Sequence, residues 1–555
     1  MKILFCALNS KYIHSTLAPW YLSAAVEKVD GVIADVFEGT INEKLDDLYE
    51  KIKAYEFDII GFSTYIWNKD YVLLLAKIIK QKLNKKVILG GPEVSYNAKE
   101  ILSENDFIDA VISGEGEEPF YQLASGENYE EIGGFCYRKN GEIIVKEPHI
   151  SVSDPPFPYT QKYFDSLVGR IAYLETSRGC PFRCAFCLSG RQGSVRFFDL
   201  EESKRKILLL ANSGTQTVKF IDRTFNADRK RAKEIFGFII NKYGKRIPKN
   251  VCFHFEIEAT LIDEETLEIL EKAPVGLFQF EIGLQSFNEK TLQYIYRRSD
   301  LEKTVSAIQK IISLGNIHVH IDLIAGLSYE TFESFGNGFN RALELRPNML
   351  QLGFLKMLHG AEMREDKERF ETEYEDKPPY EIISTKWLSK EELKMLHMLE
   401  DVFEKLYNSG RFLRTCEYFF SLIENPFSEM IKFAEYCDKN LKNNTLDDFT
   451  EALYNYLLKF DGVDRLALRD MLALDRLSTN KMGVLPEFLK VHSPLIKKML
   501  NELEKEKETR REKNVKRAAT ILLSRPAFVY VDYKNLHKVK KSYKVIEIYI
   551  NIDEK

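Results

Sequence analysis

The chain has 555 residues, of which 45% are hydrophobic and 29% are charged, and its formal net charge is −5. A chain of this length is too long for one hydrophobic core, so we expect three or more structural units. The small negative charge excludes a global electrostatic attraction to nucleic acid or to a membrane surface, and no apolar run reaches transmembrane length. Scattered cysteines in apolar surroundings suit reduced thiols, so we expect a cytoplasmic protein without a membrane partner.

The first predicted unit, residues 1–127, alternates apolar strand-like stretches with amphipathic helical ones. We expect strands over 2–8, 32–37, 58–65, 86–89 and 110–112, and helices over 19–27, 42–54, 71–83, 97–102 and 117–123. Continuous apolar strands joined by helices predict a doubly wound, Rossmann-like (flavodoxin-like) parallel sheet that is covered on both faces.

Ligands bind such sheets beyond the carboxyl ends of the strands. The residues there are mostly small or polar, and the glycines among them let the backbone approach a bulky ligand closely. The candidate ligand-binding residues are Asn9, Ser10, Ser63, Thr64, Trp67, Gly90, Gly91, Pro92, Gly114, Glu115 and Gly116. Ordinary turns of a doubly wound domain are the alternative, which the spacing alone does not exclude.

Residues 128–164 form a predicted connector. A hairpin with an Asn140-Gly141 turn is expected over 133–145, and a stiff proline linker follows over 154–159. We assign no chemistry to either part.

The central predicted unit, residues 165–368, repeats a strand-plus-helix pattern six times. The expected strands are 171–175, 218–222, 252–257, 277–282, 319–323 and 350–355. Such repeats match a partial (β/α)6 barrel of the TIM type, whose active site lies at the carboxyl ends of the strands. On the third strand we assign Glu256 rather than Glu258 to the interior face with His254, because side chains alternate along a strand.

Three of the eight cysteines, Cys180, Cys184 and Cys187, lie close together directly after the first of these strands. Thiolates at positions i, i+4 and i+7 can ligate three of the four irons of a cubane and leave the fourth open. A structural zinc site would need four closed ligands, usually from two cysteine pairs, and the chain has no second pair. Three free thiols, or a disulfide and a spare thiol, are the alternative, which the clustering beside Gly179 and Pro181 disfavours.

The CxxxCxxC spacing, with Phe186 before the last cysteine, resembles the signature of the radical S-adenosylmethionine (SAM) superfamily. The resemblance implies a 4Fe-4S cluster held by Cys180, Cys184 and Cys187 as metal-binding and catalytic residues. The open iron would bind SAM, and an electron from the cluster would cleave SAM to a 5′-deoxyadenosyl radical. The SAM-binding residues that the resemblance implies are Phe186, Asp222, Asn226, Glu256, Gln285, Ser286 and Gly326.

Three glycine-containing stretches of the first unit, 61–63, 90–93 and 114–117, resemble the cobalamin-binding domain that precedes many radical SAM barrels. The resemblance implies that the strand-end candidates of that unit bind cobalamin. The DxHxxG motif, which supplies a histidine ligand to cobalt, is absent. His14 is the only candidate for that role but lacks the preceding aspartate pattern, so we interpret it as a polar turn residue and expect no histidine below the cobalt. If cobalt has no histidine ligand, Trp67 could exclude water from its lower face. The alternative is that Trp67 is an ordinary core residue.

The last predicted unit, residues 369–555, is mostly helical. Helices are expected over 389–407, 411–423, 427–442, 446–459, 465–474 and 484–512, and a terminal β-hairpin over 528–533 and 543–549. This region resembles the uncharacterised domain appended to one branch of the cobalamin-type radical SAM proteins. We expect it to cap the barrel mouth and keep water out.

The resemblance implies an enzyme, and we expect a cobalamin-dependent C-methyltransferase that acts on an unactivated carbon. Rearrangement or cyclisation without methyl transfer would use the same cofactors, and a non-catalytic cobalamin- or SAM-responsive binding protein is the alternative from another class. Methylthiotransfer to tRNA is disfavoured, because that family carries a second three-cysteine cluster where this chain has only Cys6. The expected partners are a small-molecule substrate rather than nucleic acid, and a low-potential electron donor such as flavodoxin or ferredoxin.

Overall fold

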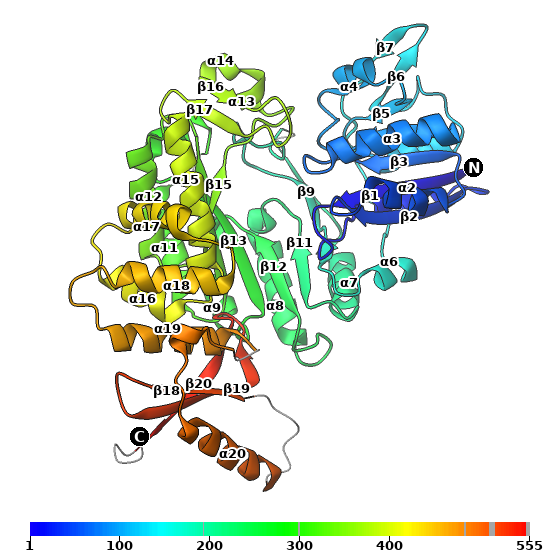
Figure 1. Cartoon of the computed structure of the whole chain (residues 1–555). Helices are drawn as coiled ribbons and strands as arrows, with labels where there is room; N and C mark the ends of the chain where they lie inside the picture. Colours follow the sequence, from blue (N-terminus) through cyan, green and yellow to red (C-terminus); the bar gives the residue numbers. More distant parts are fainter. Residues whose placement is uncertain (192–193, 298–299, 482–483, 510–516, 551–555) are drawn as a thin grey trace.

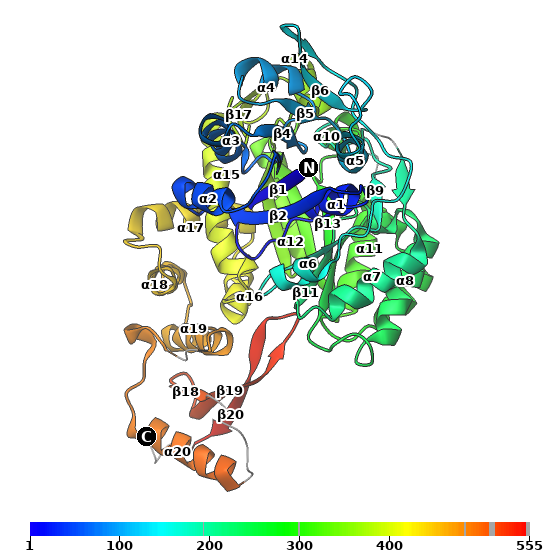
Figure 2. The same ribbon diagram turned by 90° about the vertical axis from the view of Figure 1, so that its right-hand side faces the viewer.

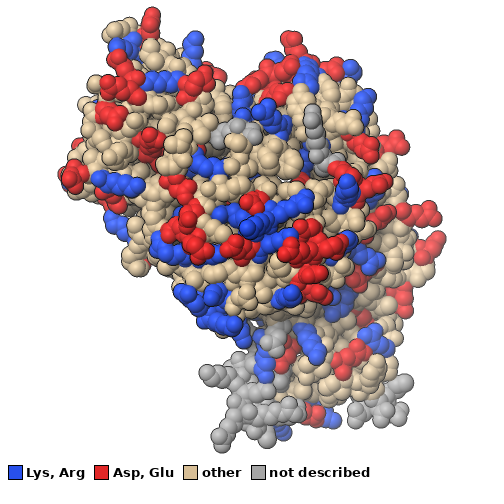
Figure 3. Space-filling view, turned by 180° about the vertical axis from the view of Figure 1, so that it is seen from behind, with Lys and Arg blue, Asp and Glu red and all other residues tan. Residues whose placement is uncertain are grey.

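The structure is a computed structural model that describes residues 1–191, 194–297, 300–481, 484–509 and 517–550. Figure 1 shows an N-terminal α/β unit, a central unit built on a parallel sheet, and C-terminal helices followed by strands. In the view turned by 90°, the N-terminal sheet lies in front of the central sheet, and the last strands project away from the body (Figure 2). Acidic and basic side chains are interspersed over the face seen from behind (Figure 3). Within the described part of the chain, none of the helices combines the length and the apolar character that a bilayer crossing requires.

The N-terminal unit is a seven-stranded sheet in the order β2-β1-β3-β4-β5-β6-β7. Its strands are β1 (Lys2–Asn9), β2 (Ile33–Thr40), β3 (Ile59–Ser63), β4 (Lys86–Gly90), β5 (Ala110–Ile112), β6 (Phe135–Lys139) and β7 (Glu142–Ile144). Its helices are α1 (Ala18–Val26), α2 (Leu45–Lys53), α3 (Lys69–Leu83), α4 (Ala98–Glu104) and α5 (Glu117–Ala124). The strands β1 to β5 are parallel, so the predicted doubly wound sheet is confirmed. The predicted connector hairpin extends this sheet, because β6 pairs antiparallel with β5.

Alternation along β1 explains why both faces of this sheet are covered. Ile3 and Phe5 pack with α1 and α5 on one face, whereas Leu4, Cys6 and Leu8 pack with α2, α3 and α4 on the other. The five parallel strands end at the same edge, so the loops that follow them lie side by side there.

The central unit is a six-stranded parallel sheet in the order β15-β14-β13-β12-β11-β8. Its strands are β8 (Ala172–Leu174), β11 (Thr217–Phe220), β12 (Cys252–Glu256), β13 (Phe278–Gln285), β14 (His318–Ala325) and β15 (Met349–Phe354). The helices and short turns before, between and after them are α6 (Gln161–Ser166), α7 (Leu200–Ala211), η1 (Phe225–Ala227), α8 (Arg229–Lys242), η2 (Ala259–Leu261), α9 (Glu264–Glu271), α10 (Glu289–Tyr294), α11 (Leu301–Ser313) and α12 (Phe332–Glu344). Sequential strands are spatial neighbours with helices between them, so the partial (β/α)6 barrel is confirmed.

The C-terminal unit begins with two short helices, a small hairpin and a helical bundle. These elements are α13 (Glu362–Glu365), α14 (Lys367–Phe370), β16 (Thr372–Tyr374), β17 (Ile382–Thr385), α15 (Lys390–Phe403), η3 (Glu404–Asn408), α16 (Leu413–Ser421), α17 (Pro426–Asn440), α18 (Leu446–Leu457), α19 (Arg465–Thr479) and η4 (Glu487–Leu489). The bundle lies against the edge of the barrel, where α17 contacts α12 and η3 contacts β15.

One prediction for the end of the chain is wrong and another is confirmed. The helix expected over 484–512 begins only at α20 (Pro494–Thr509), because Pro494 suits the first helical position and disfavours a helical residue before it; its expected last residues lie outside the described ones. The terminal hairpin is confirmed, since β19 (Ala527–His537) pairs antiparallel with β20 (Ser542–Tyr549), and β18 (Arg517–Leu522) adds a third strand that was not predicted.

Candidate active site

A cavity of about 230 Å³ opens at the carboxyl ends of strands β8, β11, β12, β13 and β14. Six predicted site residues line it, namely Cys180, Cys184, Phe186, Cys187, Glu256 and Gln285. It is also lined by Phe182, Ser189, Arg223, Thr224, Ile257, Glu258, Glu281, Gly283, Arg297 and Asp322, to which we assigned no role from the sequence. Within the described residues this lining ends at Asp322. The bundle flanks the barrel, whereas the Met363 amide of α13 donates to the Ala185 carbonyl of the cysteine loop at 3.1 Å, so a cap over the cavity stays a prediction.

The cysteine loop is closed by two glycines. Strands β9 (Ser177–Gly179) and β10 (Val195–Phe197) pair antiparallel on either side of it. Gly179 has a φ of +95°, and a side chain there would collide with the carbonyl of Ser194. A side chain at Gly190 would collide with the carbonyl of Phe182 in the same way. The backbone therefore returns on itself and holds the three cysteines on one short loop.

The three thiols fit the ligand set of a cubane with one open iron. All three are free and line the same cavity. Burial raises the pKa of Cys184 to about 11, although the Arg297 charge opposes the shift. A thiolate at this position is therefore costly unless a metal ion stabilises it. The Sγ atom of Cys187 accepts a hydrogen bond from the Ser189 amide at 3.4 Å, and Thr224 Oγ1 lies 3.3 Å from Cys180 Sγ.

Four of the residues predicted to bind SAM do not line the cavity. Asp222 is buried, and its carboxylate accepts hydrogen bonds from the amide and hydroxyl of Thr176 and from the hydroxyl of Ser177. Asn226 is buried as well, and its side-chain amide pairs with the backbone of Glu258. These two residues brace the strand ends from behind, so a direct contact with SAM stays a prediction.

Ser286 and Gly326 are also turned to structural contacts. Ser286 is buried and its hydroxyl donates to Glu330. Gly326 has a φ of +89°, and a side chain there would collide with Ile382 of β17. The glycine thus allows β17 to approach the end of β14.

Glu258 lies in the cavity wall together with Glu256, so the expectation that only one of them faces the interior is wrong. The two residues share the parity of His254, and β12 ends at Glu256, after which the chain bends into η2. Glu258 is 3% exposed and pairs with Arg297 at 2.5 Å. Arg297 also donates to the carbonyl of Gly283 at 2.9 Å, so it links the ends of β12 and β13.

The floor of the cavity carries a network of ionisable side chains from neighbouring strands. The Oε2 atom of Glu281 lies 3.0 Å from the Lys219 ammonium and 2.8 Å from His254 Nε2. Burial opposes ionisation of Glu281, but the hydrogen bond from His254 and the charge of Lys219 hold its pKa well below the usual range. Glu281 is therefore a carboxylate at neutral pH.

The predicted cobalamin residues gather at the carboxyl edge of the N-terminal sheet. Ser63 and Thr64 are buried after β3, whereas Ser10, Gly90, Pro92, Gly114 and Gly116 are at least partly exposed. Gly91 has a φ of +110°, and a side chain there would meet the Thr64 carbonyl at 2.5 Å. Gly114 has a φ of +90°, and a side chain there would collide with the backbone of His149. These two glycines are needed for close approach between loops, whatever ligand lies beside them.

Two members of this set are committed to other side chains. The Asn9 amide donates to Glu38 at 3.0 Å and accepts from the Thr16 hydroxyl. Glu115 pairs with Arg178 at 2.6 Å and with Arg196 at 2.7 Å. Their proposed contacts with cobalamin would therefore have to share these partners.

Two aromatic side chains of this edge, Trp67 and His14, have different surroundings. Trp67 stacks on Tyr65 with ring centroids 4.5 Å apart, and its indole nitrogen donates to the Leu8 carbonyl at 3.0 Å. His14 Nδ1 lies 2.8 Å from the Tyr173 hydroxyl of β8. This contact is what we expect of a polar turn residue.

Buried polar atoms that lack a hydrogen-bond partner among the described residues make this edge a fit for a ligand. They are the hydroxyl of Thr64 and both amide atoms of Asn97, in the loops that follow β3 and β4.

Three family models match separate parts of the chain. They are described as "B12 binding domain" over residues 3–124, "Radical SAM superfamily" over residues 174–338 and "Protein of unknown function (DUF4080)" over residues 368–525. The chain joins a B12-binding domain to a radical SAM domain. The radical SAM domain implies a 4Fe-4S cluster and SAM, and the B12-binding domain implies cobalamin, so the predicted set of cofactors is confirmed at the level of domains.

Known proteins resemble about half of the chain. The cobalamin-dependent radical SAM methyltransferase TokK of Streptomyces tokunonensis is 26% identical over 309 residues, which cover 52% of this chain and 45% of TokK. The anaerobic magnesium-protoporphyrin IX monomethyl ester cyclase of Rubrivivax gelatinosus is 24% identical over 345 residues, which cover 58% of this chain and 60% of the cyclase. The chain thus spans about half the length of these curated relatives.

A solved structure has the same radical SAM architecture. The cobalamin-dependent SAM radical enzyme OxsB, with aqua-cobalamin and SAM bound, matches with a TM-score of 0.61 at 14% identity, over 92% of this chain and 81% of OxsB. This likeness establishes the fold of the radical SAM protein, while the roles of individual site residues stay predictions.

Proposed function

We propose that this protein is a cobalamin-dependent radical SAM C-methyltransferase that acts on an unactivated carbon of a small molecule. The observation that carries the proposal is the convergence of three free thiols on one cavity at the barrel strand ends, in a chain that also carries a B12-binding domain. The likeness to TokK favours methyl transfer as the outcome.

The residues of the cavity take distinct parts in this proposal. When bound, the cluster supplies the electron that cleaves SAM, and cobalamin supplies the methyl group. Cys180, Cys184 and Cys187 hold the cluster, and Phe186 and Gln285 hold SAM beside it. The Arg297–Glu258 pair closes the cavity wall behind them. We place the protein in a reducing cytoplasm with flavodoxin or ferredoxin as electron donor, in keeping with eight free cysteines.

The test is anaerobic reconstitution of the full chain with iron, sulfide, cobalamin and SAM under a strong reductant. We expect cluster absorbance, 5′-deoxyadenosine and cobalamin uptake in the wild type. Cys184→Ala should lose the cluster absorbance and cleave SAM at least 100-fold more slowly, yet still bind cobalamin. Cys437→Ala is the matched control, because Cys437 is also buried and free but lies in α17, away from the cavity. SAM cleavage that survives in Cys184→Ala would refute the cluster site.

Cyclisation or rearrangement without methyl transfer is a second candidate. The likeness to the Rubrivivax gelatinosus cyclase favours it. The mass of the product separates the two outcomes, since methylation adds one methylene unit. Cobalamin uptake without SAM cleavage in the wild type would instead favour a binding protein.

A further inference from the structure

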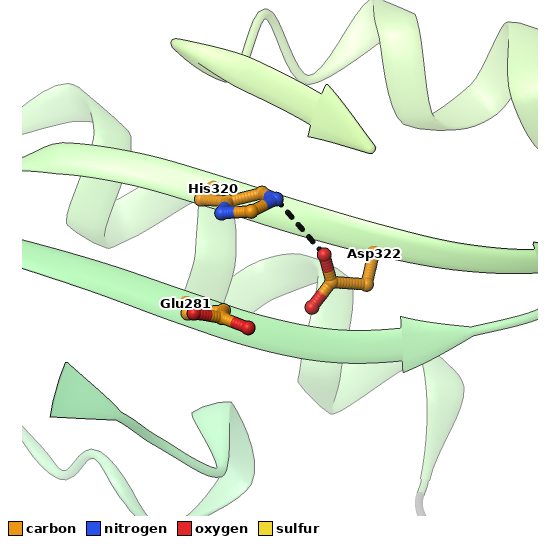
Figure 4. Close-up of side chains that lie close together, drawn as sticks. All are labelled: Glu281, His320 and Asp322. Atoms are coloured by element: carbon orange, nitrogen blue, oxygen red, sulfur yellow. Dashed lines mark ion pairs between the residues drawn. The ribbon is translucent and has the colours of Figure 1, made fainter. Parts of the chain in front are cut away.

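Three side chains on neighbouring strands converge at the floor of the cavity. In the parallel register of β13 and β14, Glu281 lies beside His320 and Gly283 lies beside Asp322. Figure 4 shows the His320 ring and the Asp322 carboxylate turned toward one another, with Glu281 on the adjacent strand. One donor atom from each residue lies within 4.8 Å of the other two. Glu281 and Asp322 line the cavity itself.

His320 and Asp322 contact each other without forming a hydrogen bond. His320 is 5% exposed, and its Nε2 atom lies 2.9 Å from Asp322 Oδ1. By hydrogen-bond geometry neither atom has a partner in the described part of the chain, so the contact is that of an ion pair. Two donor atoms that bind one metal ion at about 2.1 Å and at right angles lie about 3.0 Å apart. The pair therefore has the separation of two adjacent metal ligands.

The third residue is oriented by its own partners. The hydrogen bonds that the described residues make to the Glu281 carboxylate end on Oε2, from His254 and Lys219. This leaves Oε1 for a further ligand. Fixing one carboxylate oxygen through neighbouring donors is how proteins orient metal ligands.

The surrounding charges leave room for a cation. Lys219 and Arg223 each lie 3.9 Å from Glu256, which offsets part of their charge. Among the described residues, Asp322 has no ion-pair partner except His320. A partly buried carboxylate beside a buried imidazole needs either a proton between them or a cation.

We propose that Glu281, His320 and Asp322 form a binding site for a divalent first-row metal ion, separate from the three cysteines. One imidazole nitrogen with two carboxylate oxygens suits Mn²⁺, Fe²⁺ or Zn²⁺. Three protein ligands leave open coordination positions on such an ion. These positions face the cavity, because Glu281 and Asp322 line it. An oxygen donor of the substrate would occupy one of these positions; this last step rests on the proposed function.

The test uses the full chain after its cluster has been reconstituted. Mn²⁺ is added stepwise, and the electron paramagnetic resonance signal of free Mn²⁺ is followed. We expect one bound ion in the wild type. His320→Gln and Asp322→Asn should each weaken Mn²⁺ binding at least tenfold. Glu381→Gln is the matched control, because His397 and Glu381 form another pair at 2.9 Å that lacks a third ligand. If His320→Gln and Asp322→Asn both bind Mn²⁺ as tightly as the wild type does, the proposal is overturned.

A second measurement needs no variant and so does not depend on how the variants fold. Pulsed resonance on the wild type with bound Mn²⁺ should detect coupling to one imidazole nitrogen. Bound Mn²⁺ without nitrogen coupling, or no bound ion at all, would mean that a proton occupies the place between His320 and Asp322. Neither measurement requires SAM cleavage, so a failure of the proposed function would leave this result readable.

Discussion

Gly283 has no side chain, and the side-chain amide of Gln285 occupies the space that a side chain at position 283 would need. Gly283 and Gln285 flank the register shift between β13 and β14, and Gln285 has a φ of +72°. A left-handed conformation costs a non-glycine residue on the order of 1–3 kcal/mol, so the surrounding packing has to hold it in place. The bulge turns Gln285 toward the cavity, where the sequence predicts a contact with SAM.

Gly283→Ala should therefore weaken SAM binding without unfolding the protein. The new methyl group would collide with the side-chain amide of Gln285, which is a flexible group that can move out of the cavity. We expect the Kd for SAM to rise about tenfold, or about 1.4 kcal/mol, in equilibrium binding to the reconstituted protein. Gly353→Ala in β15 is the control, since a side chain there meets only ordinary contacts. Unchanged SAM binding would remove Gln285 from the site.

Site residues were predictable where their chemistry is local in the sequence. The three cysteines and Phe186 lie on one loop, so their spacing alone indicates a shared ligand. Arg297 and Glu258 are 39 positions apart, and only folding brings them together, so no spacing could indicate their pair. The contact of Asp222 with SAM was implied by the resemblance and stays a prediction, and its hydrogen bonds with the amide and hydroxyl of Thr176, 46 positions away, could not be read from the sequence.

At the scale of elements, strands were predictable where apolar runs are long. Strands β1, β3, β4 and β5 are mostly continuous apolar stretches, whereas β12, β13 and β14 alternate apolar with polar residues, and both patterns are visible in the sequence. Strand β18 was missed because Ala518, Ala519 and Thr520 have little apolar character. Its pairing with β19, rather than its own sequence, makes it a strand.

The element that leads into the cysteine loop is tied to the B12-binding domain by one arginine. Arg178 of β9 pairs with Glu175 at 3.0 Å, and with Glu115 and Glu117 of the N-terminal unit at 2.6 Å each. Burial works against the charge on Arg178, but these carboxylates raise its pKa well above the usual value. The network therefore fixes the loop after β5 against the strand before Cys180.

Arg178→Met should destabilise the fold by about 3 kcal/mol, because it leaves partly buried carboxylates without their partner. The shift would be measured as a lower urea midpoint of the full chain. Arg191→Met should change stability by less than about 0.5 kcal/mol, because its pair with Glu365 is largely exposed. Equal effects of the two substitutions would contradict a structural role for the network.

At the scale of the whole molecule, the segment after the barrel reaches back to the N-terminal unit. The Tyr380 hydroxyl donates to the buried carboxylate of Glu93 and accepts from Lys69 Nζ at 2.7 Å. Glu93 directly follows the Gly90–Pro92 stretch that is predicted to bind cobalamin. Gly360 packs against the Tyr96 ring of the same loop. The segment after the barrel thus contacts the predicted cobalamin loop from outside the cavity.

Tyr380→Phe tests this link, because it removes one hydroxyl and keeps the ring. Glu93 would lose a donor while it stays buried, which costs about 1–2 kcal/mol. We expect amide hydrogen exchange over residues 91–97 to become about tenfold faster, with a parallel loss of cobalamin affinity. Tyr374→Phe in β16 is the control in the same segment. Faster exchange throughout the chain would indicate general destabilisation, and exchange at the wild-type rate over 91–97 would show that the loop holds its place without Tyr380.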